Sequence, residues 1–397
     1  MTHNTNKKPF NLTHPCHFPD DFSGYPSKLP LHAELLAIGD SPPRVVPSVN
    51  IPTTDGVKVD PHSYETRQGD YIYESAIGEY GPDCRKGQMA RVTGMAVDEH
   101  DPTQPLVVVG ESRGNFIQWF HLHGRLEQAR EAGVKIRDVC IGELGTVVAT
   151  VAERDYALAK WDSALFQGGV RQENLFRSSS KHRAQVDSEP FGVARDSQGR
   201  YMVTVLAKDR VCRWDERRVG DNIFWFGDSG GGAMGFNGPY YVAKMSNDFT
   251  VVSSTNDHKV KVVDDERERL VKEIGGLGCD LPDLCYPHGV CVDSKDNIYI
   301  ADTGNFRVVV YDKDGGFLSC PVNETWNYGT DVKPTNVAVM QDGRLLVVMQ
   351  GRGYCQVHVY QPKRESSQSE ESECECSWMR CLTLSCCMSH GDYEPLD

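Results

Sequence analysis

Basic, amide and aromatic side chains recur along this chain in short segments that also contain aspartate or glycine. Basic groups attract phosphates and aromatic rings stack on bases, so such a set could hold single-stranded RNA. The same residue types contact protein partners, and the neighbouring acids offer them ordinary ion pairs. We therefore predict a binding surface for a protein or, alternatively, for single-stranded RNA. Its candidate residues are Arg113, Asn115, Arg154, Tyr156, Lys208, Arg210, His258, Lys259, His288, Asn305, Arg307, Arg352 and Tyr354.

Catalytic chemistry has little support in the sequence. It contains neither the glycine-rich P-loop that cradles phosphates nor the HExxH motif that binds zinc. The aspartates are spread along the chain and do not form one acid–base pair. We therefore predict that the chain is not an enzyme, with no catalytic residue, no metal and no cofactor.

An internal repeat sets the spacing of these residues. Its clearest unit, residues 286–319, reads YPHGVCVDSKDNIYIADTGNFRVVVYDKDGGFLS and alternates apolar runs with Asp, Asn and Gly. This pattern predicts short antiparallel strands joined by tight turns. Equivalent apolar residues mark six units, 44 to 54 residues apart when neighbouring numbers are subtracted: Met95, Val139, Val193, Val242, Val290 and Val337.

Six small sheets in sequence predict an all-β fold, because each can bury both faces only against its neighbours. We predict a six-bladed β-propeller whose blades are four-stranded and antiparallel. Residues 69–81, GDYIYESAIGEYG, resemble an outer strand followed by its exit turn. We expect residues 70–78 to complete the sixth blade, whose other strands lie between Pro334 and Tyr360. The propeller domain then covers residues 69–361.

The fifth unit resembles an NHL repeat. The resemblance lies in Pro287-His288-Gly289-Val290, Ala301-Asp302 and the motif Asn305-Phe306-Arg307, and it extends more weakly over roughly residues 70 to 361. This resemblance implies the propeller fold. It also implies a protein-interaction scaffold, including substrate recruitment in ubiquitin-dependent degradation, or binding of single-stranded RNA on the loop face. Many relatives carry a zinc-binding RING domain, for which His3, His14, Cys16 and His17 are too few.

One enzyme class remains as the weakest alternative. The amidating lyases resemble NHL propellers, and the resemblance implies a metal held by several histidines at the blade entrances. His288 is the only histidine at the entrance position of a repeat unit in this sequence. We expect it to be a hydrogen-bonded entrance residue. The equivalent positions are Thr93, Arg137, Phe191, Tyr240 and Thr335, none of which is an expected zinc ligand.

The two ends of the chain differ in composition from the repeats. Residues 1–68 are rich in Pro, Asn, Thr and Ser and predict a disordered lead-in. Residues 362–397 form an acidic and then cysteine-rich tail, also predicted to be disordered. Apolar residues flank Cys381, Cys386 and Cys387, which makes lipidation and membrane attachment an alternative to a plain tail. A metal clasp with His390 is less favoured, since no CxxC pair occurs.

The charge and hydropathy of the chain limit its partners. Its formal net charge is -14, which argues against DNA binding and against a generally basic surface. No run approaches the roughly 20 apolar residues of a membrane-spanning helix, and the N-terminus lacks the apolar run of a secretory signal. We therefore expect a cytoplasmic protein. Its expected partner is a protein, and single-stranded RNA is the alternative.

Overall fold

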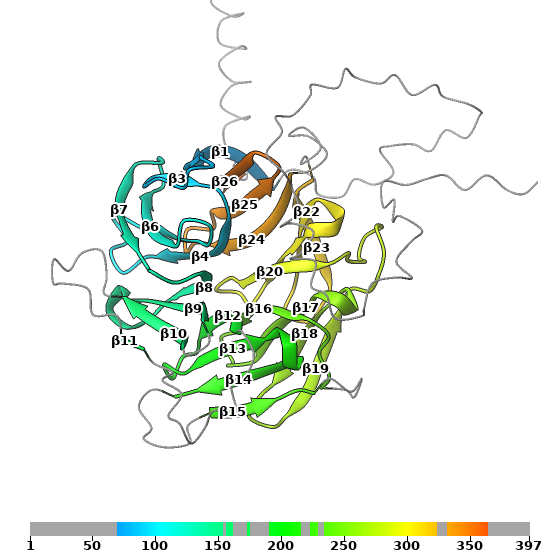
Figure 1. The fold of residues 1–397 in the computed structure, drawn as a ribbon. Coiled ribbons are helices and arrows are strands. Elements are labelled where there is room, and N and C mark those ends of the chain that lie inside the picture. Colours follow the sequence, from blue (N-terminus) through cyan, green and yellow to red (C-terminus); the bar gives the residue numbers. More distant parts are fainter. Residues whose placement is uncertain are drawn as a thin grey trace, which may run out of the picture.

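The computed structural model describes residues 70–153, 156–161, 173–174, 190–215, 223–228, 234–323 and 332–363. In these residues the strands form six four-stranded antiparallel sheets, arranged as blades around a common centre (Figure 1). The predicted all-β, six-bladed propeller is therefore confirmed. The predicted tails, with Cys381, Cys386 and Cys387, lie outside the described residues. Within the described part of the chain, no helix is both long and apolar enough to cross a membrane.

The first three blades, each given from the inner to the outer strand, follow the repeat. Blade one contains β4 (Val92–Asp98), β5 (Leu106–Glu111), β6 (Phe116–His121) and β7 (Leu126–Glu131). Blade two contains β8 (Ile136–Ile141), β9 (Val147–Glu153), β10 (Tyr156–Trp161) and β11 (Glu173–Asn174). Blade three contains β12 (Pro190–Arg195), β13 (Tyr201–Val205), β14 (Arg210–Trp214) and β15 (Ile223–Phe226).

The last three blades have the same strand order. Blade four contains β16 (Pro239–Lys244), β17 (Thr250–Ser254), β18 (Lys259–Asp264) and β19 (Arg269–Ile274). Blade five contains β20 (Pro287–Val292), β21 (Ile298–Asp302), β22 (Arg307–Tyr311) and β23 (Phe317–Val322). Blade six contains β24 (Lys333–Val339), β25 (Leu345–Gly351) and β26 (Tyr354–Pro362), with β1 (Tyr71–Ile77) as its outer strand.

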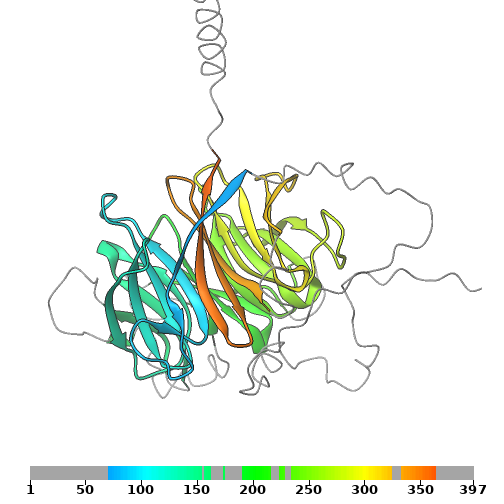
Figure 2. The same ribbon diagram turned by 90° about the horizontal axis from the view of Figure 1, so that it is seen from above.

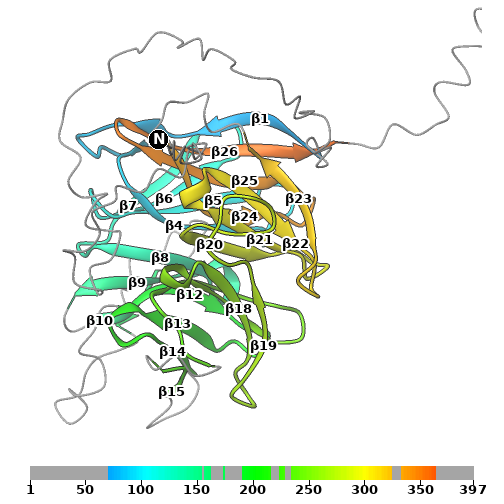
Figure 3. The ribbon, with the colours of Figure 1, turned by 90° about the vertical axis from the view of Figure 1, so that its right-hand side faces the viewer.

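The ring is closed by its first strand. β1 pairs antiparallel with β26, from Tyr71 opposite Pro362 to Ile77 opposite Val357. The backbone N–H of Lys363 also donates a 2.7 Å hydrogen bond to the carbonyl of Asp70. The two strands lie side by side in the views of Figures 2 and 3, with β1 in blue and β26 in orange. The expected closing strand is therefore confirmed.

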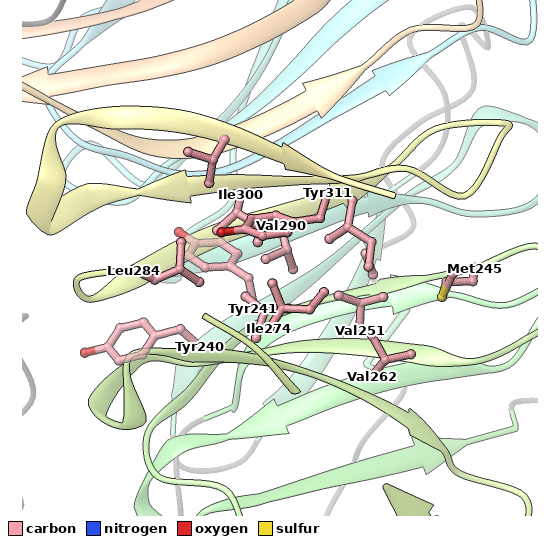
Figure 4. Close-up of a cluster of buried hydrophobic side chains, with 14 of the residues drawn as sticks. Tyr240, Tyr241, Met245, Val251, Val262, Ile274, Leu284, Val290, Ile300 and Tyr311 are labelled. Carbon is pink, nitrogen blue, oxygen red and sulfur yellow. The ribbon is translucent and has the colours of Figure 1, made fainter. Parts of the chain in front are cut away.

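The core is divided among the six junctions between neighbouring blades. Successive residues of a strand point to opposite faces, so each strand supplies two junctions. In blade four, Val251 packs in the cluster shared with blade five, whereas Val252 packs in the cluster shared with blade three. Figure 4 shows the junction of blades four and five, where Val251 and Val262 face Val290, Ile300 and Tyr311. Burial on both faces explains why the strands read as continuous apolar runs.

Small residues let the inner strands approach one another closely. A Cβ atom on Gly289 would lie 2.5 Å from the Cα of Asn336 in the next blade. Gly94 and Gly192 meet the backbone of the following blade at similar distances, 2.6 Å and 2.5 Å. These glycines stand in blades one, three and five, so they alternate with larger residues around the centre.

Buried threonines join five of the six blades to the backbone of the next. The hydroxyl of Thr204 in blade three donates to the carbonyl of Tyr240 in blade four, at 2.7 Å. Thr255 donates to Pro287 at 2.6 Å, and Thr303 donates to Pro334 at 2.7 Å. Equivalent bonds run from Thr93 to Ile136 and from Thr150 to Phe191. Five junctions thus share one polar link beside their apolar core.

We expect Gly289→Ala to destabilise the propeller by about 1–3 kcal/mol, because the new methyl group meets backbone that cannot move aside freely. Urea unfolding followed by circular dichroism measures the change. Gly276→Ala is the matched control, since a Cβ there would have its nearest neighbour at 3.7 Å, the end of the Asp283 side chain. Equal stability of the two variants would contradict the close-approach argument.

Candidate functional site at the channel mouth

The starts of the six inner strands gather at one end of the central channel. Strands within each blade are antiparallel, so the turn between the second and third strands returns to the end where the inner strand begins. The loop that leads from an outer strand to the next blade reaches the same end. We call the residues at the starts of the inner strands the channel mouth. They are Arg91, Thr93, Arg137, Phe191, Tyr240, His288, Lys333 and Thr335.

A β-bulge marks each entrance. In blade three the pairing register shifts between Pro190 and Val193, and equivalent shifts occur at the start of the inner strand in the other five blades. A bulge places an extra residue on one strand and re-aims its side chain. It thereby separates Phe191, Tyr240 and His288 from the regular alternation of their strands.

These side chains contact one another in blade order. The guanidinium carbon of Arg137 lies 5.9 Å from the centre of the Phe191 ring. Phe191 meets Tyr240 edge to face, with ring centres 4.9 Å apart. Tyr240 and His288 are stacked at 5.1 Å, with planes only 7° apart. Blades two to five thus contribute a continuous belt of one cation and three rings, and each ring is at most 5% exposed.

Positive charge gathers on the other half of the mouth. Arg91 precedes the inner strand of blade one, and Lys333 begins the inner strand of blade six. Burial, followed by repulsion from Arg137, lowers the pKa of Arg91. The ammonium group of Lys333 lies 4.9 Å from the centre of the Phe306 ring. Cations therefore come from blades six, one and two, and aromatic rings from blades three, four and five.

His288 is a buried neutral base at this mouth. It is 5% exposed, and burial, with a smaller contribution from Lys333, lowers its pKa to about 4. Its Nε2 atom has no hydrogen-bond partner among the described residues. The expectation of a hydrogen-bonded entrance residue is therefore wrong for this nitrogen. Stacking on Tyr240 holds the ring instead.

Tyr241 spans the channel beneath the mouth. Its hydroxyl donates a 2.6 Å hydrogen bond to the carbonyl of Thr93, which lies in blade one, opposite blade four in the ring. The side chain is 5% exposed, and burial raises its pKa far above the ordinary value. Burial also raises the pKa of the Asp138 carboxyl group. This group accepts a 2.9 Å hydrogen bond from the backbone N–H of Val193. Tyr241 thus links two blades on opposite sides of the central channel.

Two predicted binding residues instead stabilise loops. Arg307 is 7% exposed, and its guanidinium donates to Asp302 and to the carbonyls of Cys279 and Asp283, each at 2.8 Å. Burial raises the pKa of Asp302 to about 6, which still leaves it ionised at neutral pH. Asn305 donates to Asp302 at 2.8 Å and to the carbonyl of Gly278 at 2.9 Å. The structure thus commits the Asn305–Arg307 motif to the loop between blades four and five.

The other predicted residues are distributed around the mouth. Arg113, Arg210 and Arg352 are exposed, each beside the turn between a second and a third strand. Lys208 lies 5.6 Å from the centre of the Trp225 ring, and Lys259 forms a 2.7 Å ion pair with Glu273.

The remaining predictions concern residues that are partly buried or not described. His258 accepts a 3.1 Å hydrogen bond from the N–H of Tyr286, and burial lowers its pKa. Tyr354 donates to Gln356 at 2.8 Å. Asn115 is partly buried and has a φ of 56°. Arg154 and the side chain of Tyr156 lie outside the described residues.

The described part of the chain contains no group of three His, Cys, Asp or Glu side chains placed to hold a metal ion. The eight cysteines described there are all free thiols.

The sequence Gly227-Asp228-Ser229-Gly230-Gly231 fits the GxSxG pattern of some serine hydrolases. It follows β15 in a connection between two blades, whereas the catalytic pattern joins a strand to a helix. Ser229 itself lies outside the described residues.

Sequence reasoning missed Arg91, Lys333 and Tyr241 as features of the site. Arg91 and Lys333 could have been found from their positions within the repeat, because they stand two residues before the entrance residues Thr93 and Thr335. An alignment of the six entrances, rather than of their turns, separates the cationic half of the mouth from the aromatic half. Nothing in the sequence indicated that Tyr241 extends across the ring, because this contact depends on which blades lie opposite each other.

Together, the fold and its mouth define a six-bladed propeller that carries an NHL repeat. Residues 284–311 match the family model "NHL repeat", which confirms the resemblance seen in the sequence. The chain is 49% identical over 37 residues to Protein lin-41 of Caenorhabditis elegans, covering 9% of this chain and 3% of that protein. It is 39% identical over 64 residues to NHL repeat-containing protein 3 of Homo sapiens, covering 16% and 18%. The matches thus span less than a fifth of either relative.

Solved structures share the fold. A luciferin-regenerating enzyme superposes with a TM-score of 0.52 at 11% identity, covering 74% of this chain and 96% of that chain. A gluconolactonase from Xanthomonas campestris gives a TM-score of 0.50 at 15% identity, covering 72% and 98%. At such identities the likeness shows the propeller architecture alone, and the activities in these names belong to those proteins.

We expect Arg307→Lys to destabilise the protein by about 1–3 kcal/mol, because one ammonium cannot reproduce three guanidinium hydrogen bonds in fixed directions. Hydrogen exchange should become faster at Gly278 and Leu284, whose amides bond within the loop that Arg307 holds. Arg210→Lys is the control, since Arg210 is exposed at the start of β14. Unchanged exchange in the loop would show that Arg307 does not secure it.

Acid should weaken the fold through His288. Its pKa is about 4 when folded and about 6.5 when unfolded, so the unfolded chain binds the extra proton first as pH falls. The stability due to the neutral ring is therefore complete above pH 6.5 and declines as pH falls toward 4. We expect the loss between pH 7 and pH 5, measured by urea unfolding, to be about 2 kcal/mol larger in the wild type than in His288→Gln. An equal loss in both would contradict this.

Proposed function

We propose that this protein is a non-catalytic interaction platform, located in the cytoplasm, which binds a protein partner at the channel mouth and the surrounding loops. The observation that supports this most directly is the division of the mouth into a cationic half and an aromatic half. Aromatic rings and arginines dominate the binding energy of many protein interfaces. Polar groups and rings brought together from six blades would give such a partner a fixed orientation.

Single-stranded RNA is the second candidate, because Arg113, Arg210 and Arg352 are exposed near the mouth. The surrounding charges favour a protein: Arg307 is buried, and Lys259 is paired with Glu273. A polyanion must keep many phosphates near the surface, and the net charge of -14 repels it.

Substrate recruitment in ubiquitin-dependent degradation is the more specific form of this proposal. Its support is the family resemblance alone. A bound partner that is ubiquitinated in cells only when the channel-mouth loops are intact would support it.

We expect affinity capture with the full chain to retain a partner that survives RNase treatment. The variant Arg113→Glu/Arg210→Glu/Arg352→Glu should reduce capture at least tenfold, because it reverses three exposed charges beside the mouth. The control Arg125→Glu/Lys295→Glu/Lys313→Glu reverses three exposed charges at turns of the opposite end and should have no effect. Binding of the partner, once identified by mass spectrometry, is then measured with the purified protein.

The outcomes separate the two candidates. Loss of ultraviolet crosslinking to RNA in the first variant, without any RNase-resistant protein that depends on the same residues, would replace the protein platform with RNA binding. Equal effects of both triple variants would reject the mouth as the binding surface.

A further inference from the structure

Exposed cations gather where blades six and one meet, at the same end of the propeller as the channel mouth. Arg352 lies in the turn between β25 and β26, and Arg113 lies in the equivalent turn of blade one, between β5 and β6. Arg85 and Lys86 lie in the loop that leads from β1 to the inner strand of blade one. All four residues are exposed to solvent. We call these four residues the basic sector.

A close contact joins the turn of blade one to this loop. A Cβ atom on Gly114 would lie 2.7 Å from the Cβ of Cys84. Gly114 directly follows Arg113, and Cys84 directly precedes Arg85. The part of the turn that carries Arg113 therefore packs against the part of the loop that carries Arg85.

The turn of blade six adjoins the same loop. Cys355, three residues after Arg352, packs with Tyr80 in the core cluster that blades six and one share. The side-chain amide of Gln356 donates a 3.0 Å hydrogen bond to the carbonyl of Gly78, at the start of the loop. The basic sector is therefore one surface, built from two neighbouring turns and the loop between them.

The positive charge of the basic sector is largely unpaired. Within the part of the chain that the structure describes, Lys86, Arg113 and Arg352 form no ion pair. Arg85 pairs with Asp83 at 3.4 Å, and both side chains of this pair are exposed. An exposed pair of this kind contributes little free energy and exchanges its partner easily. The sector therefore has charge available for an acidic ligand.

The acids closest in sequence do not neutralise the basic sector. Glu111 is buried, and its carboxylate accepts hydrogen bonds from the backbone N–H groups of Arg91, Arg113 and Gly114. Glu111 thus fixes the turn between β5 and β6. The loop itself adds Glu79 to the acid already paired with Arg85, so the exposed cations outnumber the exposed acids of the loop.

An acidic segment of the same chain is long enough to reach this surface. Residues 365–375 contain five glutamates and no lysine or arginine. β26 runs over nine residues from the turn of Arg352 to Pro362, so the chain leaves blade six at the end opposite the mouth. An extended chain advances about 3.3 Å per residue, so residues 364–372 can cover the length of β26 in the reverse direction. The last glutamates of residues 365–375 would then lie level with Arg352.

We infer that residues 365–375, the acidic segment, bind the basic sector and compete there with the protein partner of the channel mouth. The competition rests on the proposed function, whereas the contact itself does not. Single surface ion pairs are weak, but several glutamates act together, and the short connection to blade six keeps their effective concentration high. The contact therefore forms within one chain and gives way to a partner that binds more tightly.

Carbodiimide crosslinking of the full chain, followed by mass spectrometry, tests the contact. The reagent joins a lysine amine to a carboxylate as an amide, so Lys86 should be joined to glutamates of the acidic segment. Lys295 and Lys313 are the comparison, because they are exposed in turns at the end where the chain leaves blade six. We expect the segment to be joined to Lys86 roughly fivefold more often than to either of them. Equal crosslinking of the three lysines would overturn the contact.

Isotope labelling distinguishes a contact within one chain from a contact between two. In an equimolar mixture of ¹⁴N-labelled and ¹⁵N-labelled protein, each crosslinked pair of peptides should carry a single isotope. Pairs of mixed isotope would assign the contact to two copies of the chain and overturn the inference.

The variant Arg113→Gln/Arg352→Gln removes two cations of the sector and keeps Lys86 for the crosslink. It should reduce crosslinking of Lys86 to the acidic segment roughly threefold, because fewer charges hold the segment. Arg125→Gln/Arg267→Gln is the matched control: both residues are exposed at turns of the opposite end, and crosslinking should not change. An equal reduction in both variants would reject the basic sector as the docking surface. Unfolding midpoints show that the variants are folded.

A variant in which glutamine replaces every glutamate of the acidic segment tests the competition. Affinity capture of the protein partner should increase roughly threefold, because the segment no longer occupies the sector. Unchanged capture would overturn the competition. The replacements are Glu365→Gln, Glu370→Gln, Glu371→Gln, Glu373→Gln and Glu375→Gln.

The outcomes separate this inference from the proposed function. If the crosslinks to Lys86 are absent and capture still depends on Arg113, Arg210 and Arg352, the platform stands and the contact of the acidic segment is overturned. If the crosslinks form and no partner is captured, the contact stands, and the platform and the competition both fail.

Discussion

The structure depends on the close contact between the inner strands of neighbouring blades. Gly289 brings blade five against the backbone of blade six, and Thr303 links the same two blades through the carbonyl of Pro334. Neither a glycine nor a buried threonine could achieve this alone: the glycine removes steric bulk, and the hydroxyl satisfies a carbonyl that close packing hides from water. The apolar clusters of the outer strands can form only at the spacing that these contacts set.

The same contact shapes the site. Because the inner strands begin with a bulge, one residue per blade escapes the regular alternation and reaches the mouth. The repeat therefore fixes where these residues stand and leaves their identity free to vary. Arg137, Tyr240 and His288 occupy equivalent positions and carry three different chemistries. Asymmetry in a ring of similar blades thus comes from side chains at entrances whose backbones are alike.

Much of the fold could be predicted because turn residues and apolar runs report local structure. The position of Val290 and its five equivalents, and the role of residues 70–78, follow from repeat phase alone. The site was predicted less well. Arg307 looks like an exposed cation in sequence, yet it is buried, because three acceptors reach it from Asp302 and from a loop some 25 residues earlier. The partners of Arg307 depend on how the loop before blade five folds back onto that blade, whereas the contact of Tyr241 with Thr93 arises only when the ring closes.

The pairing of β1 with β26 has a mechanical consequence. The chain enters the propeller at Asp70 and leaves it at Lys363, and these two residues are hydrogen-bonded to each other. A force that pulls the two ends apart therefore loads the ladder at Tyr71 and Pro362 first and passes to Ile72 and Gln361 only after that pair has separated. Strands peeled in this way yield one bond at a time, at lower force than strands sheared along their length. The seam of the ring is thus weak against tension applied at Asp70 and Lys363, and the end of the seam that yields last is the one beside the channel mouth.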